Sequence, residues 1–162
     1  MKKSICYILI CVLLTIGFLG LGPMEMESNA APNHYSPDDL IRFHVIANSD
    51  SEHDQLLKYA VRDEILKEVS PRLARSGSLL ESRIILEGMY DELLDIARRV
   101  IQEWGYDYAV ALEYGVFAFP TKSYGDIVLA GGDYEAVEIK IGQAQGANWW
   151  CVLFPPLCFA NA

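Results

Sequence analysis

The chain has 162 residues, of which 22 are acidic and 13 are basic, so its formal net charge at pH 7 is −9. This length suits one domain with a hydrophobic core of its own, rather than a miniprotein that depends on disulfides. The negative charge repels phosphate backbones and anionic membrane surfaces. Composition and charge therefore argue against nucleic acid as a ligand.

The first 30 residues have the pattern of an export signal. Lys2 and Lys3 precede an uncharged, mostly apolar run over residues 5–21, and residues 28–30 (Ser-Asn-Ala) supply the small side chains that a signal peptidase needs. The run is slightly long for a signal peptide and slightly short for a membrane span, so cleavage and retention as an N-terminal anchor both stay open. Either outcome places the domain outside the cytoplasm, and membrane contact is expected only through residues 5–21 of an uncleaved chain.

Residues 31–39 read as a linker, residues 40–159 as the single domain and residues 160–162 as a tail. The domain opens with a β-rich segment over residues 40–47. Ser51 and Asp54 then have the spacing of a capping box, and apolar residues at helical spacing follow. This first helix is expected to end near Pro71 and Gly77.

A second capping box begins the next helix at Ser78 and Glu81. An apolar stripe from Leu86 to Trp104 predicts a long helix that Gly105 ends. Gly88 weakens the middle of this stripe and is the point at which the helix would divide.

After Gly105 the pattern changes to strands and turns. A strand is expected over residues 106–114 with extended chain through 116–119, then a hairpin of residues 127–129 with 134–141 around Gly131-Gly132, and a last strand over 149–154. Helices grouped before strands predict an α+β fold. We expect an N-terminal strand, two amphipathic helices and a mainly antiparallel sheet of about four further strands.

Four cysteines are present. Cys6 and Cys11 lie within the export signal, whereas Cys151 and Cys158 remain as an even pair in the domain. In an exported protein such a pair favours a disulfide. Two buried free thiols are the alternative.

Residues with catalytic potential do not form a recognisable set. The acidic residues around Asp50–Asp54 lack the glycine and the final glutamate of a calcium loop and fit a helix N-cap. Cys151 could act as a thiol nucleophile with His44 or His53 as the base, which would make the chain a secreted thiol hydrolase, but no nucleophile motif surrounds it. We therefore assign no catalytic, cofactor-binding or metal-binding residue and do not expect an enzyme.

The stretch from Gly142 to Phe159 contains two tryptophans, two cysteines, two prolines and two phenylalanines. On a strand, Trp149 and Trp150 point to opposite faces, so one is expected in the core while the other is available to a partner. The residues expected to contribute to partner binding are Asn148, Trp149, Trp150, Phe154, Phe119 and Tyr124.

Several separate motifs, in order, resemble one family, the stage II sporulation protein R family, over residues 40–159. They are Arg42, Val45–Ser51, Lys58, Val61–Asp63, Phe119–Lys122, Tyr124-Gly125, Ala130-Gly131, Tyr134–Ala136, Ile141-Gly142 and Gly146–Cys158.

The resemblance implies a secreted signalling protein of endospore formation. Such a protein is made in the forespore and exported into the space between the septal membranes. There it would activate a membrane-embedded aspartic protease of the mother cell, which cleaves the inactive precursor of sigma factor E. The family member is then the protease activator and not the enzyme, and the resemblance brings no catalytic residues and no cofactor with it.

Overall fold

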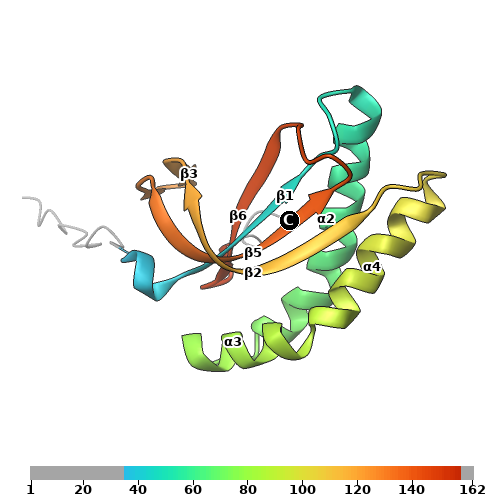
Figure 1. Ribbon diagram of the computed structural model, residues 1–162. Helices are drawn as coiled ribbons and strands as arrows, with labels where there is room; N and C mark the ends of the chain where they lie inside the picture. The colour runs from blue at the N-terminus through green and yellow to red at the C-terminus, as the bar shows by residue number, and fades with distance from the viewer. Residues whose placement is uncertain (1–34, 158–162) are drawn as a thin grey trace, which may run out of the picture. The chain divides into compact units, whose positions relative to one another are not determined.

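One strand from the beginning of the domain and three from its second half form the main sheet of the computed structural model, which describes residues 35–157 (Figure 1). The predicted export signal, most of the linker, Cys158 and the tail lie outside the described residues. The elements are η1 (Pro37–Asp39), β1 (Ile41–Ile46), α2 (Glu52–Leu73), α3 (Leu79–Gly88), α4 (Tyr90–Glu103), β2 (Val110–Phe119), β3 (Lys122–Tyr124), β4 (Ile127–Leu129), β5 (Gly132–Ile141) and β6 (Asn148–Phe154).

The main sheet is mixed, with strand order β2-β5-β1-β6. β1 is parallel to β5, while the β2–β5 and β1–β6 pairs are antiparallel. The predicted α+β class with its mainly antiparallel sheet is confirmed, and the parallel pair arises because the helices intervene between β1 and the later strands.

The helices begin where the capping patterns predict. The hydroxyl of Ser51 accepts a hydrogen bond from the Asp54 amide at the start of α2, and Ser78 accepts one from the Glu81 amide at the start of α3. The second predicted helix divides into α3 and α4 immediately after Gly88. Pro71 lies inside the last turn of α2, which continues to Leu73, slightly beyond the predicted end.

The helices cover one face of the main sheet, with α2 and α4 packed against each other (Figure 1). This helix face buries the apolar side chains of alternate sheet residues, because successive side chains of a strand point to opposite faces. Phe43, Val45, Leu112, Val137 and Ile139 are each 5% exposed or less. Among the described residues, no helix is long and apolar enough to cross a membrane.

The predicted hairpin of residues 127–129 with 134–141 is wrong. β4 pairs with β3 around the two-residue turn Gly125-Asp126, and β5 pairs along its whole length with β2. Gly125 has φ +59°, which suits such a tight turn. The sequence favoured the nearer partner for β5, but the ten-residue β2 forms a longer ladder with it than three-residue β4 would. The first strand after the helices also begins at Val110 and not at Tyr106.

The second face of the main sheet carries aromatic and charged side chains. A smaller core of Leu40, Phe119, Tyr134, Ala136 and Val152 lies there with Trp150 and Tyr124 packed against it. Arg42, His44 and Glu138 are buried on the same face, with 0%, 3% and 6% exposure. We call this the aromatic face.

Candidate functional site

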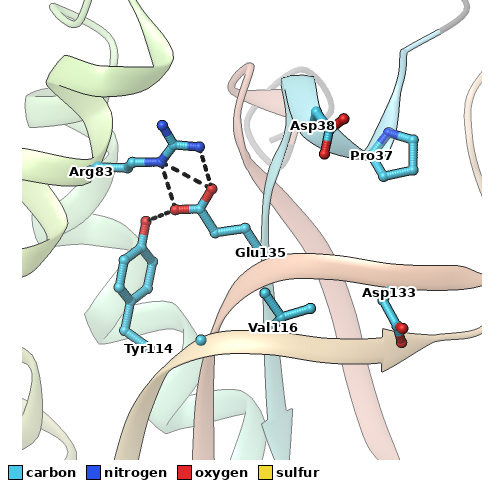
Figure 2. A pocket seen from close by; sticks show the side chains of 8 residues that line it. Pro37, Asp38, Arg83, Tyr114, Val116, Asp133 and Glu135 are labelled. Atoms are coloured by element: carbon cyan, nitrogen blue, oxygen red, sulfur yellow. Dashed lines mark hydrogen bonds and ion pairs between the residues drawn. The ribbon is translucent and has the colours of Figure 1, made fainter.

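A half-open pocket lies between β2, β5, α3 and η1 (Figure 2). Gly115 and Val116 of β2 line it together with Asp133 and Glu135 of β5. Pro37 and Asp38 of η1, Arg83 of α3 and Tyr114 complete the lining, and the volume is ≈ 340 Å³. We call it the carboxylate pocket, since three of its side chains are acidic.

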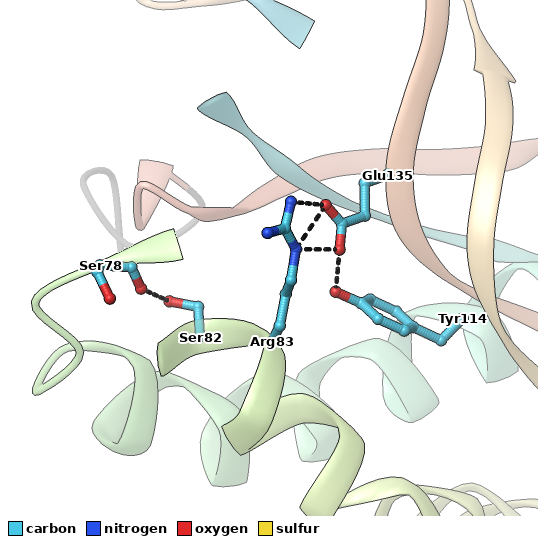
Figure 3. A network of polar contacts seen from close by, with 5 residues as sticks. All are labelled: Ser78, Ser82, Arg83, Tyr114 and Glu135. Carbon is cyan, nitrogen blue, oxygen red and sulfur yellow. Dashed lines mark hydrogen bonds and ion pairs between the residues drawn. The ribbon is translucent and has the colours of Figure 1, made fainter. Parts of the chain in front are cut away.

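Arg83 holds α3 against the sheet through Glu135 (Figure 3). Its Nε and Nη2 donate to the two carboxylate oxygens of Glu135 at 2.8 and 2.7 Å, and the Tyr114 hydroxyl donates to the same carboxylate. The hydrogen bonds from Arg83 lower the pKa of Glu135, outweighing its burial, and Tyr114 adds to this effect. Burial, followed by the hydrogen bond to Glu135, raises the pKa of Tyr114.

The start of α3 is fixed by short-range hydrogen bonds, which place Arg83 at the pocket. The buried hydroxyl of Ser82 donates to the main-chain oxygen of Ser78 at 3.1 Å (Figure 3). Glu81 accepts from the amide of Gly77, just before the helix begins. These hydrogen bonds fix the first turn of α3, and Arg83 extends from this turn to the sheet.

The other two carboxylates of the pocket remain available. Within residues 35–157, neither Asp38 nor Asp133 has an ion pair, and both are exposed. Val116, which lines the same pocket, is 70% exposed. The pocket thus combines an internally neutralised Glu135 with two unneutralised acids, an arrangement that favours a cationic group.

The aromatic face buries Arg42 without a carboxylate partner in the described part of the chain. Its guanidinium lies 4.0 Å from the centre of the Phe119 ring and 4.6 Å from that of Tyr134, and Nη2 donates to the Tyr124 hydroxyl at 2.9 Å. Two ring faces stabilise a buried guanidinium by cation–π attraction. Arg42 therefore ties the β3–β4 hairpin to the main sheet.

His44 lies beside Arg42 on this face and stacks on Trp150 with ring centres 4.8 Å apart. Its Nε2 is 3.0 Å from a Glu138 carboxylate oxygen, which favours the charged ring, but Glu138 is already paired with Lys140 at 2.7 Å. Burial, then the charges of Lys140 and Arg42, lower the pKa of His44 to about 4. Neither ring nitrogen has an aligned hydrogen bond that would stabilise the charged ring, so the lowering effects of burial and of the two cations dominate. At neutral pH His44 is an uncharged packing residue.

The residues from Asn48 to Asp54 form a structural junction. Asp54 is 4% exposed and accepts hydrogen bonds from Asn48 and Ser49 at 2.8 and 2.5 Å. Burial acts to raise the pKa of Asp54, but these hydrogen bonds and others lower it below its usual value. Among the described residues, no group of three or more potential ligands could hold a metal ion.

The same junction fixes the start of β6. Asp50 accepts from the amide of Ala147 at 2.7 Å, and Asn48 accepts from the amide of Gln143 at 2.9 Å. Gly146 approaches so closely that an added Cβ would lie 2.2 Å from the main-chain oxygen of Ser49. Several of the motif residues that are far apart in sequence therefore serve one structural purpose, which is to position β6.

Trp149 and Trp150 point to opposite faces of the sheet, as predicted. Trp149 packs edge-on against Phe43 on the helix face, and the Arg62 guanidinium lies 4.9 Å from its ring centre. Trp150 packs against His44 on the aromatic face. Both are half-buried, so each retains some accessible surface.

The other residues predicted to bind a partner differ in their exposure. Phe119 is 4% exposed and its ring already contacts Arg42 and Trp150. Tyr124, Asn148 and Phe154 are half-buried. The structure does not bring all six residues together, because Trp149 and Trp150 lie on opposite faces. Their part in partner binding stays a prediction.

The geometry does not favour the thiol hydrolase. Cys151 is 4% exposed and disulfide-bonded, and it is the sole cysteine of residues 35–157. Its pairing with Cys158 stays a prediction, since Cys158 lies outside the described residues. Cys151 lies opposite Phe43 in the β1–β6 register, on the helix face, whereas His44 points to the aromatic face. His53 is exposed at the start of α2.

The carboxylate pocket was missed from the sequence. Glu135 belongs to one of the motifs that carry the family resemblance, but its partner Arg83 is 52 residues away, on a helix whose capping box and apolar stripe say nothing about contacts with the sheet. Asp38 was assigned to the linker. Pro120, which follows Phe119, indicated that this strand lies at a sheet edge or ends there. The sequence does not show that Val116 on this strand is exposed beside a pocket.

Comparison with known proteins agrees with the motif pattern. Residues 37–162 match the family model described as Stage II sporulation protein R. A curated relative, Stage II sporulation protein R of Bacillus subtilis (strain 168), is 38% identical over 163 aligned residues, which cover 99% of this chain and 73% of the relative. No solved structure matches the chain significantly. The chain belongs to the stage II sporulation protein R family.

Proposed function

We propose that this chain is an exported signalling protein of endospore formation that activates a septal membrane aspartic protease, which then cleaves the sigma-E precursor in the mother cell. The observation that carries the proposal is family membership over the whole domain, residues 37–162. The predicted export signal supports delivery into the space between the septal membranes, whether the chain is secreted or stays anchored there.

The physical basis of activation is a shift of population. A ligand activates a protease when it binds the active arrangement more tightly than the inactive one. Equal affinity for both arrangements would leave the equilibrium unchanged, however tight the binding.

The proposal is tested by co-expressing this chain, the membrane protease and the sigma-E precursor of the same organism in a non-sporulating host. We expect precursor cleavage that requires both this chain and its residues 1–30. An uncut precursor in the presence of all three folded proteins would contradict direct activation.

One substitution in the same assay distinguishes an activator from a thiol enzyme. Cys151→Ser removes the sulfur nucleophile, and a folded variant is expected to keep activating cleavage. Loss of activation by a variant that is folded and still binds the protease would favour thiol chemistry instead.

The tryptophan anchors are tested by Trp149→Ala and Trp150→Ala. We expect one or both to reduce cleavage while the chain still folds, because a half-buried tryptophan offers a large contact area to a partner. If both folded variants activate cleavage like the wild type, the predicted anchors are wrong.

A further inference from the structure

β2 is an edge strand of the main sheet, paired on one side only, with β5 (Figure 1). In an antiparallel ladder the N–H and C=O of each residue point to the same side, and the side alternates along the strand. Ala109 accepts from the Gly142 amide and therefore faces β5. The register of β2 and β5 has no shift, so the odd-numbered residues of β2 also face β5. The even-numbered residues from Val110 to Ala118 therefore direct their N–H and C=O groups outward, away from β5.

A tyrosine closes part of this outer edge. The Tyr90 hydroxyl donates to the main-chain oxygen of Leu112 at 2.8 Å, which agrees with an outward-facing Leu112. No such contact is made, within the described part of the chain, to the outward N–H and C=O groups of Tyr114, Val116 and Ala118. Val116 and Ala118 are exposed. The open edge therefore runs from Tyr114 to Ala118.

This edge lacks the usual protection. Natural edge strands are shielded by lysine, proline, a bulge or a covering element. β2 contains no lysine and no proline, its register with β5 has no shift, and Val116 is 70% exposed.

The carboxylate pocket adjoins the open edge and limits the choice of partner. Gly115 and Val116 line the pocket together with Asp38 and Asp133, which have no ion pair within residues 35–157. A strand added beside Val116 would direct alternate side chains to the helix face, next to this pocket. A lysine or arginine at such a position could neutralise the two acids.

We propose that the outer edge of β2, from Tyr114 to Ala118, pairs with an extended segment of the partner protein and that a lysine or arginine of this segment enters the carboxylate pocket. Main-chain hydrogen bonds then supply affinity, and the pocket supplies specificity. The inference rests on the proposed function, in which the partner is the membrane protease. A second copy of this chain fits less well, since each copy carries a net charge of −9.

Val116→Pro tests the edge directly. Proline removes the outward N–H of residue 116 but no hydrogen bond to β5, and proline is tolerated on edge strands. Val116→Thr is the matched control, because it keeps both the amide and the β-branched shape. Ala118→Pro removes the next outward N–H and serves if Val116→Pro does not fold.

The full chain carrying each substitution is co-expressed with the protease and precursor, and co-purification of the protease and precursor cleavage are measured. Thermal unfolding of the purified chain checks the fold. We expect a folded proline variant to lose binding and cleavage by about tenfold or more, while Val116→Thr stays near wild type. Asp133→Asn should weaken binding several-fold, whereas Asp107→Asn, a charge change near the opposite end of β2, should not.

A folded proline variant that binds and activates like Val116→Thr would overturn the edge assignment and leave the proposed function intact. A wild-type chain that neither binds nor activates the protease would refute the proposed function and, with it, the partner of the edge. Sedimentation decides between partners: a wild-type dimer that Val116→Pro dissociates would mean that a second copy occupies the edge, contrary to the proposal.

Discussion

The ammonium group of Lys58, which is 1% exposed on α2, donates a 2.9 Å hydrogen bond to the main-chain oxygen of Ala147, 89 residues later in the chain. It also donates to Gln55 at 2.6 Å. Burial, followed by the charge of Arg62, lowers the pKa of Lys58. A buried ammonium is costly unless it is hydrogen-bonded, so these two contacts explain why a lysine is tolerated there.

Replacement of this lysine should destabilise the domain. Lys58→Met keeps most of the side-chain volume but leaves the oxygens of Ala147 and Gln55 without their donor. We expect a loss of about 1–3 kcal/mol in the free energy of unfolding, measured by urea titration. Lys67→Met is the control, since the Lys67 side chain is 68% exposed and should change stability by less than about 0.5 kcal/mol. Equal effects of the two substitutions would argue against a structural role for Lys58.

Two glycines should respond to alanine in opposite ways. At Gly146 an added Cβ would lie 2.2 Å from the main-chain oxygen of Ser49, and backbone atoms cannot move aside cheaply. We expect Gly146→Ala to cost about 3 kcal/mol or more. At Gly88 nothing lies within 4 Å, so Gly88→Ala should be neutral or stabilising by up to about 1 kcal/mol. Thermal unfolding of both variants gives the comparison, and a mild effect at position 146 would contradict the close approach.

The Arg83–Glu135 pair should make stability depend on pH in acid. The pKa of Glu135 is lower in the folded chain than its usual value of 4.5. The stabilisation from this pair is therefore fully present above pH 4.5 and is lost as the pH falls through the pKa of the folded chain. Glu135→Gln should therefore flatten this part of the profile. Because Arg83 is partly exposed, we expect a cost of only about 1 kcal/mol at pH 7. Glu103→Gln, in an exposed pair with Arg99, should leave the profile unchanged.

His44 should also make stability depend on pH, in a higher pH range than the Arg83–Glu135 pair. Its pKa is about 4 in the folded chain against 6.5 when unperturbed, so the unfolded chain binds more protons between these values. Stability should fall as the pH is lowered from 6.5 to 4, by at most about 3 kcal/mol. His44→Phe should remove this slope, while His53→Gln, at an exposed histidine, should keep it. A His44 ring that titrates above pH 6.5 by NMR would contradict the lowered pKa.

Local signals in the sequence were sufficient for the helices. Ser51 and Ser78 act within three residues of their partners, and the second helix divides immediately after Gly88, where the sequence predicted it. Strand pairing could not be obtained in this way. The hydrophobic alternation of β5 shows which face is buried but does not specify whether β4 or β2 lies beside it.

The candidate site shows the same limit. The opposite orientation of Trp149 and Trp150 follows from the geometry of a single strand, and it was predicted correctly. The carboxylate pocket depends on η1, α3, β2 and β5 meeting at one place. No periodicity within one segment contains that information.

The position of β1 inside the sheet has a consequence for how the chain folds. β1 is made first, yet its neighbours β5 and β6 begin only at Gly132 and Asn148, so its contacts have a large separation along the chain. Such non-local pairing is slow to form, because a long loop must close first. The main sheet cannot assemble until nearly the whole domain has left the ribosome or a translocation channel. This order of synthesis delays folding until late, which is compatible with the proposed export of the chain in an unfolded state.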